Sequence, residues 1–120
     1  DTPDLRPHLA LPGATDLQVN GGGGVLFNAT PTPEGIAAIR AAHRALGTHA
    51  ILPTLITDAP EVMEAAADAF LAARGQPGIA GIHLEGPHLA PERRGTHAAQ
   101  HLRPLDGRTM AVLPNRKGRS

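Results

Sequence analysis

The sequence has no cysteine, tryptophan or tyrosine, and phenylalanine occurs only twice in its 120 residues. Without cysteine, disulfides and thiolate metal sites are excluded, so histidine, aspartate and glutamate are the plausible ligands for a metal ion. The same absence fits a reducing compartment, and we expect a cytoplasmic location. Because aromatic residues are so few, the core must be built from small aliphatic side chains.

The chain also has no excess of charge, since eleven basic and eleven acidic residues give a formal net charge of zero. Proteins that bind nucleic acid or an anionic membrane surface carry a basic patch, so neither partner is expected. No apolar run approaches the roughly 20 residues that a membrane-spanning helix needs. The composition therefore predicts a soluble chain of one domain.

The two ends of the chain differ in composition from its middle. Residues 1–13 are polar and punctuated by proline, so we expect an extended lead-in that continues from a missing preceding segment. After Leu89 the sequence is typical of a loop. Residues 106–120 are expected to be a divergent, disordered tail, because they end in a basic run with few apolar side chains.

The first strand is expected over residues 15–20, where polar and apolar side chains alternate. Leu17 and Val19 would share one face, and Gln18 and Asn20 the other. The four glycines that follow match no nucleotide-binding motif, and they predict a flexible turn.

A helix and a second strand are expected next. Thr32 is the predicted N-cap of a helix that begins at Pro33 and ends at Gly47. Residues 49–57 are rich in isoleucine, leucine and threonine, which favours a strand. Pro53 inside this strand predicts a bulge or another irregularity.

A second helix and a third strand complete the alternation. A capping box at residues 58–61 predicts the helix, which would end near Gly75. An apolar run that begins at Ile79 and ends in a histidine and a carboxylate predicts the strand, which a Gly-Pro turn stops directly after Glu85. This alternation demands a parallel sheet with right-handed crossovers, so the fold class is α/β. Three parallel strands cannot close a barrel, and their sheet needs cover on both faces.

Glu85 is the strongest candidate for a functional residue, because it lies at the C-terminal end of a predicted parallel strand. In parallel α/β folds the reacting groups collect at that end, where the loops form the rim of a crevice. A carboxylate in this position can hold a cation that activates water. The alternative is a solvated or salt-bridged carboxylate without a chemical role.

Several basic side chains could act with this carboxylate. His83 lies two residues earlier on the same face, where it could orient the carboxylate, contact a substrate or be a hydrogen-bonded core residue. His88 and His97 follow in the loop, with Arg93 and Arg94 between them. Together these four could polarise a carbonyl group or bind a phosphate, and the alternative for each is a plain surface position.

Gln18 and Asn20 occupy an i, i+2 arrangement in which two histidines would chelate a metal ion. Amide side chains are much poorer ligands for a cation such as zinc. These two residues could instead contact a bound ligand, or hydrogen-bond to the turn that follows.

Five short motifs occur in a fixed order along the chain. They are Pro12-Gly13, Asp16-Leu17-Gln18-Val19-Asn20-Gly21, Leu52-Pro53-Thr54, His83-Leu84-Glu85-Gly86-Pro87 and Gly95-Thr96-His97. The ordered set resembles the N-acetylglucosamine-6-phosphate deacetylases, a family of the amidohydrolase superfamily. The resemblance runs over residues 11–105, which would be a minority of a full-length family member.

The resemblance implies a metal-dependent (β/α)8 TIM barrel that converts N-acetylglucosamine 6-phosphate to glucosamine 6-phosphate and acetate, and that forms a homodimer. Residues 14–105 would be the first three βα units. By matching position, Glu85 would be a ligand of the catalytic divalent metal. Zinc is the expected metal, and iron or another divalent ion is the alternative. His97 would contact and polarise the acetamido carbonyl group. Gln18 and Asn20 replace the His-x-His of other superfamily members, which resembles the members with one metal.

The resemblance also implies what the chain lacks. The family's general-base aspartate and two further metal-ligand histidines come from later strands, and no residue here matches them. Because hydrolysis needs a firmly held metal and a base, we expect this chain to be inactive alone. His88 replaces an aromatic residue of the family, which alters the sugar pocket. The alternatives are an amidohydrolase with another N-acyl substrate, and a non-catalytic α/β module that folds by oligomerising or docking on a partner.

Overall fold

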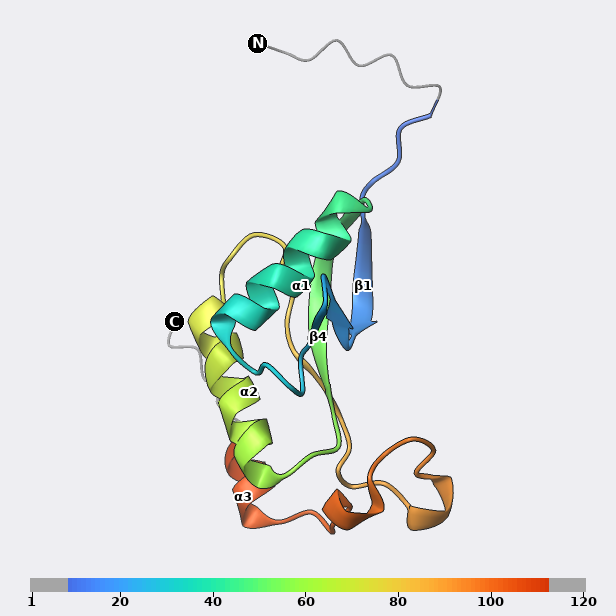
Figure 1. Cartoon of the computed structure of the whole chain (residues 1–120), viewed down its shortest axis with the longest axis vertical. Helices are drawn as coiled ribbons and strands as arrows, with labels where there is room; N and C mark the ends of the chain where they lie inside the picture. The colour runs from blue at the N-terminus through green and yellow to red at the C-terminus, as the bar shows by residue number, and fades with distance from the viewer. Residues whose placement is uncertain (1–8, 113–120) are drawn as a thin grey trace.

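Three parallel strands form the centre of the computed structural model, which describes residues 9–112. In order across the sheet they are β1 (Ala14–Val19), β4 (Thr48–Ile56) and β5 (His83–Glu85). The connecting helices α1 (Pro33–Ala45) and α2 (Pro60–Ala73) lie beside β4 on one side of the sheet (Figure 1). The predicted α/β class and the parallel sheet are therefore confirmed.

β1 departs from its predicted alternation. Val19 is buried, whereas Leu17 is 66% exposed, so the expected apolar face does not form. The pairing gives the reason, because Asp16 lies opposite Ile51 and Val19 opposite Pro53. Three residue steps of β1 thus match two steps of β4, and such a bulge interrupts the alternation of side chains. The irregularity predicted at Pro53 is confirmed.

The glycines after β1 form a small hairpin. β2 (Gly21–Gly22) pairs antiparallel with β3 (Val25–Leu26), and the two glycines between them have φ values of 62° and 80°. Such positive φ values are open to glycine without steric cost. His43 of α1 stabilises the hairpin, because its Nε2 lies 3.0 Å from the Gly21 carbonyl oxygen.

α1 begins and ends as predicted. Thr32 is the N-cap, and its Oγ1 accepts a hydrogen bond from Gly35 N at 3.1 Å. Gly47 follows the helix with a left-handed φ of 96°. Ile36 and Ile39 are fully buried against the sheet side of the helix.

The capping box predicted for α2 is wrong. Ala59 is the N-cap, and no side chain caps the helix. The Asp58 carboxylate instead accepts hydrogen bonds from Ala59 N and from Asn28 Nδ2, each at 2.8 Å. The end of the helix was predicted correctly, since α2 stops at Ala73 and Gly75 has a φ of 86°.

The third strand is shorter than predicted. Regular pairing with β4 is confined to β5, and an isolated bridge joins Ile79 to Ile51 further back. Gly81 lies between these two regions of pairing. Without a side chain to pack, glycine weakens a strand interior, which accounts for the interruption.

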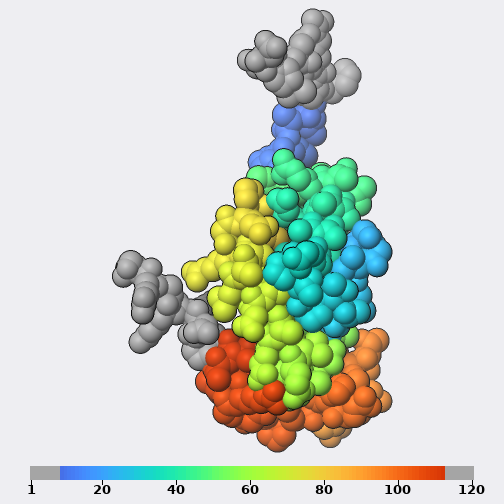
Figure 2. Space-filling model, turned by 60° about the vertical axis from the view of Figure 1, so that its left-hand side comes forward, coloured from blue at the N-terminus to red at the C-terminus, as the bar shows by residue number. Residues whose placement is uncertain are grey.

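The segment after β5 forms the base of the molecule (Figure 2). It contains the short 3-10 helices η1 (Pro91–Arg93) and η2 (Ala99–His101), and then α3 (Gly107–Val112), which packs on α2. Arg108 of α3 hydrogen-bonds to Glu64, which lowers the pKa of that carboxyl group. The expectation of a loop is therefore wrong at α3. The remainder of the expected tail, and most of the expected lead-in, lie outside the described residues.

The core lies between the two long helices and the sheet. Its buried apolar residues are Val19, Phe27, Ile36, Ile39, Ile51, Leu55, Met63, Ala66, Ala69 and Ala73. Small aliphatic side chains make up most of this set, as the composition predicted. Among residues 9–112, no helix has the length and apolar character to cross a membrane.

Candidate functional site

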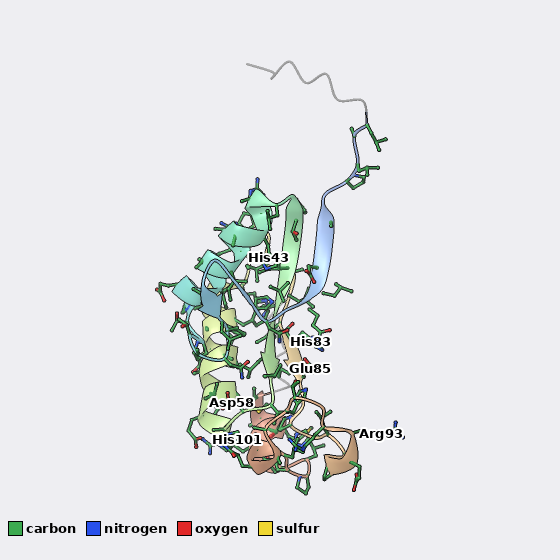
Figure 3. All side chains as sticks on the ribbon, turned by 45° about the vertical axis from the view of Figure 1, so that its right-hand side comes forward. His43, Asp58, His83, Glu85, Arg93 and His101 are labelled. Atoms are coloured by element: carbon green, nitrogen blue, oxygen red, sulfur yellow. The ribbon has the colours of Figure 1, made fainter. Side chains whose placement is uncertain are left out.

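Glu85 is the last residue of β5 and lies at the edge where the parallel strands end (Figure 3). It stands opposite Ile56, the last residue of β4. Gly86 follows with a φ of 83°, and a Cβ added there would lie 2.1 Å from Thr57 Oγ1. A glycine is therefore required for the chain to turn away directly after the carboxylate.

Two side chains contact the Glu85 carboxylate, one on each oxygen. Gln18 Nε2, near the end of β1, donates to Oε2 at 3.0 Å. His97 Nε2, from the loop after β5, lies 3.3 Å from Oε1. The structure thus brings together three predicted site residues from three separate parts of the sequence. We call Gln18, Glu85 and His97 the strand-end cluster.

Within the part of the chain that the structure describes, no lysine or arginine forms an ion pair with Glu85. The ion-pair contact of Glu85 in this part of the chain is with His97, which forms a salt bridge only if the imidazole is protonated. The Glu85 side chain is 33% exposed, so a solute can reach it. An ionised carboxylate has about four lone-pair positions, so each oxygen can accept a further ligand besides its present neighbour.

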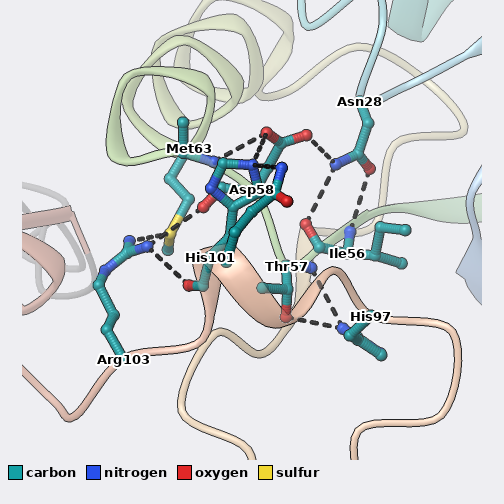
Figure 4. Close-up of polar contacts among 10 residues, drawn as sticks. Asn28, Ile56, Thr57, Asp58, Met63, His97, His101 and Arg103 are labelled. Atoms are coloured by element: carbon teal, nitrogen blue, oxygen red, sulfur yellow. Dashed lines mark hydrogen bonds and ion pairs between the residues drawn. The ribbon is translucent and has the colours of Figure 1, made fainter.

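His97 is buried, and Thr57 contacts one nitrogen of its ring (Figure 4). Its Nδ1 lies 2.7 Å from Thr57 Oγ1 and accepts a hydrogen bond from Thr57 N at 3.4 Å. Arg94 Nη1 donates to the His97 carbonyl oxygen at 3.0 Å and so supports the backbone. The ring consequently presents Nε2 to the carboxylate of Glu85.

Two predicted substrate-binding residues contact the sheet instead. Asn20 Nδ2 donates to the Thr54 carbonyl oxygen at 3.4 Å, and His83 Nδ1 lies 3.4 Å from Thr54 Oγ1. No hydrogen bond joins either residue to Glu85 among residues 9–112. These contacts are those of hydrogen-bonded structural residues, and a role of either side chain with substrate stays a prediction.

The loop after β5 separates two of the four basic residues that the sequence grouped together from His97. His88 Nδ1 donates to the Arg103 carbonyl oxygen at 2.8 Å and closes the base of the loop. Arg93 points away from the sheet at the outer end of the loop (Figure 3). Of the two histidines in the predicted group only His97 reaches Glu85, so the four side chains do not form one common site for a carbonyl group or a phosphate.

A polar network supports the end of β4 next to the strand-end cluster (Figure 4). The Asn28 side chain accepts from Ile56 N and donates to Ile56 O, each at 3.1 Å, and also donates to Asp58. Arg103 Nη1 donates to the Asp58 carbonyl oxygen at 3.2 Å. Arg103 therefore ties the loop that carries His97 to the end of β4.

Thr57 and Asn28 were not identified from the sequence as residues that support the site. Thr57 carries a usable signal, because it is the polar last residue of a predicted parallel strand. Asn28 carries none, since its partners lie 28 and 30 residues further along the chain.

The described residues supply only part of a metal site. Within residues 9–112, no group of three or more histidine, aspartate or glutamate side chains is placed to hold a metal ion. Catalytic zinc usually has three protein ligands. The donor set fits one ligand, Glu85, whose oxygens retain free lone pairs, whereas the Gln18 amide nitrogen is a hydrogen-bond donor.

The chain was compared with known proteins. No protein-family model matches it. The N-acetylgalactosamine-6-phosphate deacetylase of Shewanella sp. (strain ANA-3) is 50% identical over 111 residues, which cover 86% of this chain and 28% of the relative. The chain is similar to one segment of the amino-sugar-6-phosphate deacetylases.

Two further deacetylases support this assignment. Human N-acetylglucosamine-6-phosphate deacetylase is 36% identical over 108 residues, covering 86% of this chain and 26% of the human protein. The crystal structure of the Pasteurella multocida N-acetylglucosamine-6-phosphate deacetylase matches with a TM-score of 0.79 at 31% identity, over 84% of this chain and 27% of that one. The resemblance inferred from the motifs is confirmed, and the chain spans little more than a quarter of the length of these deacetylases.

Proposed function

We propose that this chain is part of a metal-dependent amidohydrolase that removes acetate from an N-acetylated amino sugar 6-phosphate, with N-acetylglucosamine 6-phosphate as the first candidate substrate. The strand-end cluster carries the proposal. It combines a carboxylate that lacks a lysine or arginine partner among residues 9–112 with a buried histidine, at the strand end where α/β folds hold their reacting groups. Both relatives are named as deacetylases of an N-acetylated amino sugar 6-phosphate, which supports the proposed reaction.

Each member of the cluster has a proposed role. Glu85 supplies one ligand for a divalent metal ion, with zinc as the first candidate. A bound zinc ion would act as a Lewis acid and lower the pKa of its water. His97 donates a hydrogen bond from Nε2 to the acetamido carbonyl oxygen of the substrate. Gln18 holds the Glu85 carboxylate in position through its 3.0 Å hydrogen bond.

The same resemblance supports several finer proposals. β1, β4 and β5 would be the first three strands of a (β/α)8 barrel, and the complete enzyme would be a cytoplasmic homodimer. His83 and Asn20 would contact the substrate. Because Glu85 alone is a poor metal site, the chain by itself would not turn over.

A second candidate substrate is N-acetylgalactosamine 6-phosphate. The relative named for this sugar is 50% identical to the chain, against 36% for the human enzyme named for N-acetylglucosamine 6-phosphate. The two sugars differ only in the configuration at C4, so pocket shape must decide between them. His88, which replaces an aromatic residue of the family, lies in the loop that would border this pocket.

The test transfers residues 11–105 into the matching place of the Shewanella enzyme and measures acetate release from both sugars. We expect an active chimera in which Glu85→Gln lowers kcat at least about 100-fold, because an amide is a poor ligand. Glu92→Gln, in the exposed η1, is the matched control and should leave kcat unchanged. Equal activity of the two variants would refute the role of Glu85, and the change in the kcat/KM ratio of the two sugars relative to the Shewanella enzyme shows which sugar this segment favours.

A further inference from the structure

Thr57 contacts the ring nitrogen of His97 that faces away from Glu85. Its Oγ1 lies 2.7 Å from Nδ1, and its backbone N–H points at the same atom from 3.4 Å. A neutral imidazole carries one proton, either on Nδ1 or on Nε2, and the hydrogen bond made by one nitrogen fixes the state of the other.

The neighbours of both ring nitrogens favour the proton on Nε2. A backbone amide can only donate, so a proton on Nδ1 would face the N–H of Thr57. On the other side, a bare lone pair on Nε2 would face Glu85 Oε1 at 3.3 Å, which is an acceptor. With the proton on Nε2, both conflicts become hydrogen bonds.

The Thr57 hydroxyl completes this arrangement. Its other acceptor, the Glu85 carbonyl oxygen, is 3.4 Å away, well beyond the ordinary length of an O–H···O bond. The 2.7 Å contact with Nδ1 therefore takes the hydroxyl proton. Thr57 is only 4% exposed, so water does not compete for it.

We propose that Thr57 is a positioning residue, whose hydroxyl donates to His97 Nδ1 and holds the ring in the Nε2–H tautomer aimed at the reaction centre. This inference rests on the proposed function, because only that tautomer can donate from Nε2 to the carbonyl oxygen of a substrate. Gly86 is needed for this contact, because a Cβ at that position would collide with the Thr57 hydroxyl.

The tautomer is measured by nitrogen NMR of the chain with labelled histidine, at a pH where imidazole is neutral. We expect an imine-type Nδ1 and a pyrrole-type Nε2 for His97. Thr57→Val should raise the population of the Nδ1–H form measurably, although the Thr57 N–H and Glu85 still favour Nε2–H, and Thr57→Ser should restore the original pattern. Thr96→Val, an exposed neighbour of His97, is the control and should change nothing.

A pyrrole-type Nδ1 in the unmodified chain would overturn the inference, even if no variant folds. An unchanged tautomer in a folded Thr57→Val chain would overturn it as well. In the active chimera, Thr57→Val should lower kcat about 10- to 100-fold with little change in KM, and serine should restore kcat. The NMR result does not depend on activity, so it separates a failure of this inference from a failure of the proposed function.

Discussion

Single atoms next to the strand-end cluster decide whether its contacts can form. Gly86 turns the chain after Glu85 with a φ of 83°, and its missing Cβ leaves room for the Thr57 hydroxyl. The position of Glu85 at the end of a strand could be predicted, because a Gly-Pro pair follows it. Its contact with Gln18 could not, because the bulge in β1 changes which side chains point to the strand end.

Gly86→Ala should destabilise the chain by more than its backbone conformation alone requires. Gly75 has nearly the same φ, 86°, but a Cβ there would meet no atom within 4 Å. Gly75→Ala therefore measures the conformational cost, about 1–2 kcal/mol. We expect Gly86→Ala to cost about 1–3 kcal/mol more in urea unfolding, because Thr57 must move. Equal losses in the two variants would show that the close approach to Thr57 has no energetic consequence.

At the scale of elements, prediction succeeded where the signals were local. The N-cap of α1 and the glycines after both helices involve residues within four positions of one another. The cap of α2 was predicted wrongly, because Ala59 N and the distant Asn28 occupy the Asp58 carboxylate that would have capped the helix. α3 was missed for a similar reason, since its contact with α2 includes an ion pair across 44 residues.

Thr32→Ala should destabilise the chain by about 1 kcal/mol, because the hydrogen bond to Gly35 N at the start of α1 is lost. Thr32→Ser keeps the accepting oxygen and should recover most of this loss. Chemical unfolding of the three proteins measures the difference. A serine variant as unstable as the alanine variant would mean that the oxygen does not contribute.

For the whole molecule, the sheet is covered by α1 and α2 on one side and has open surface elsewhere. A groove of about 960 Å³ runs between α2 and β5, with Phe70, Ile82 and Leu84 among its lining residues. The exposed Leu17 on the edge strand adds further apolar surface. Parallel sheets need cover on both faces, so this surface is consistent with the proposed barrel, in which further βα units would cover it.

The central claim is that Glu85 is a cation ligand rather than a structural carboxylate. Zinc titration of the labelled chain, followed by NMR of the side chains of Gln18 and His97, tests it most directly. We predict weak binding that shifts both signals, is lost in Glu85→Gln and persists in Glu92→Gln. The same zinc-dependent shifts in the Glu85→Gln chain, or none in the unmodified chain, would contradict the account.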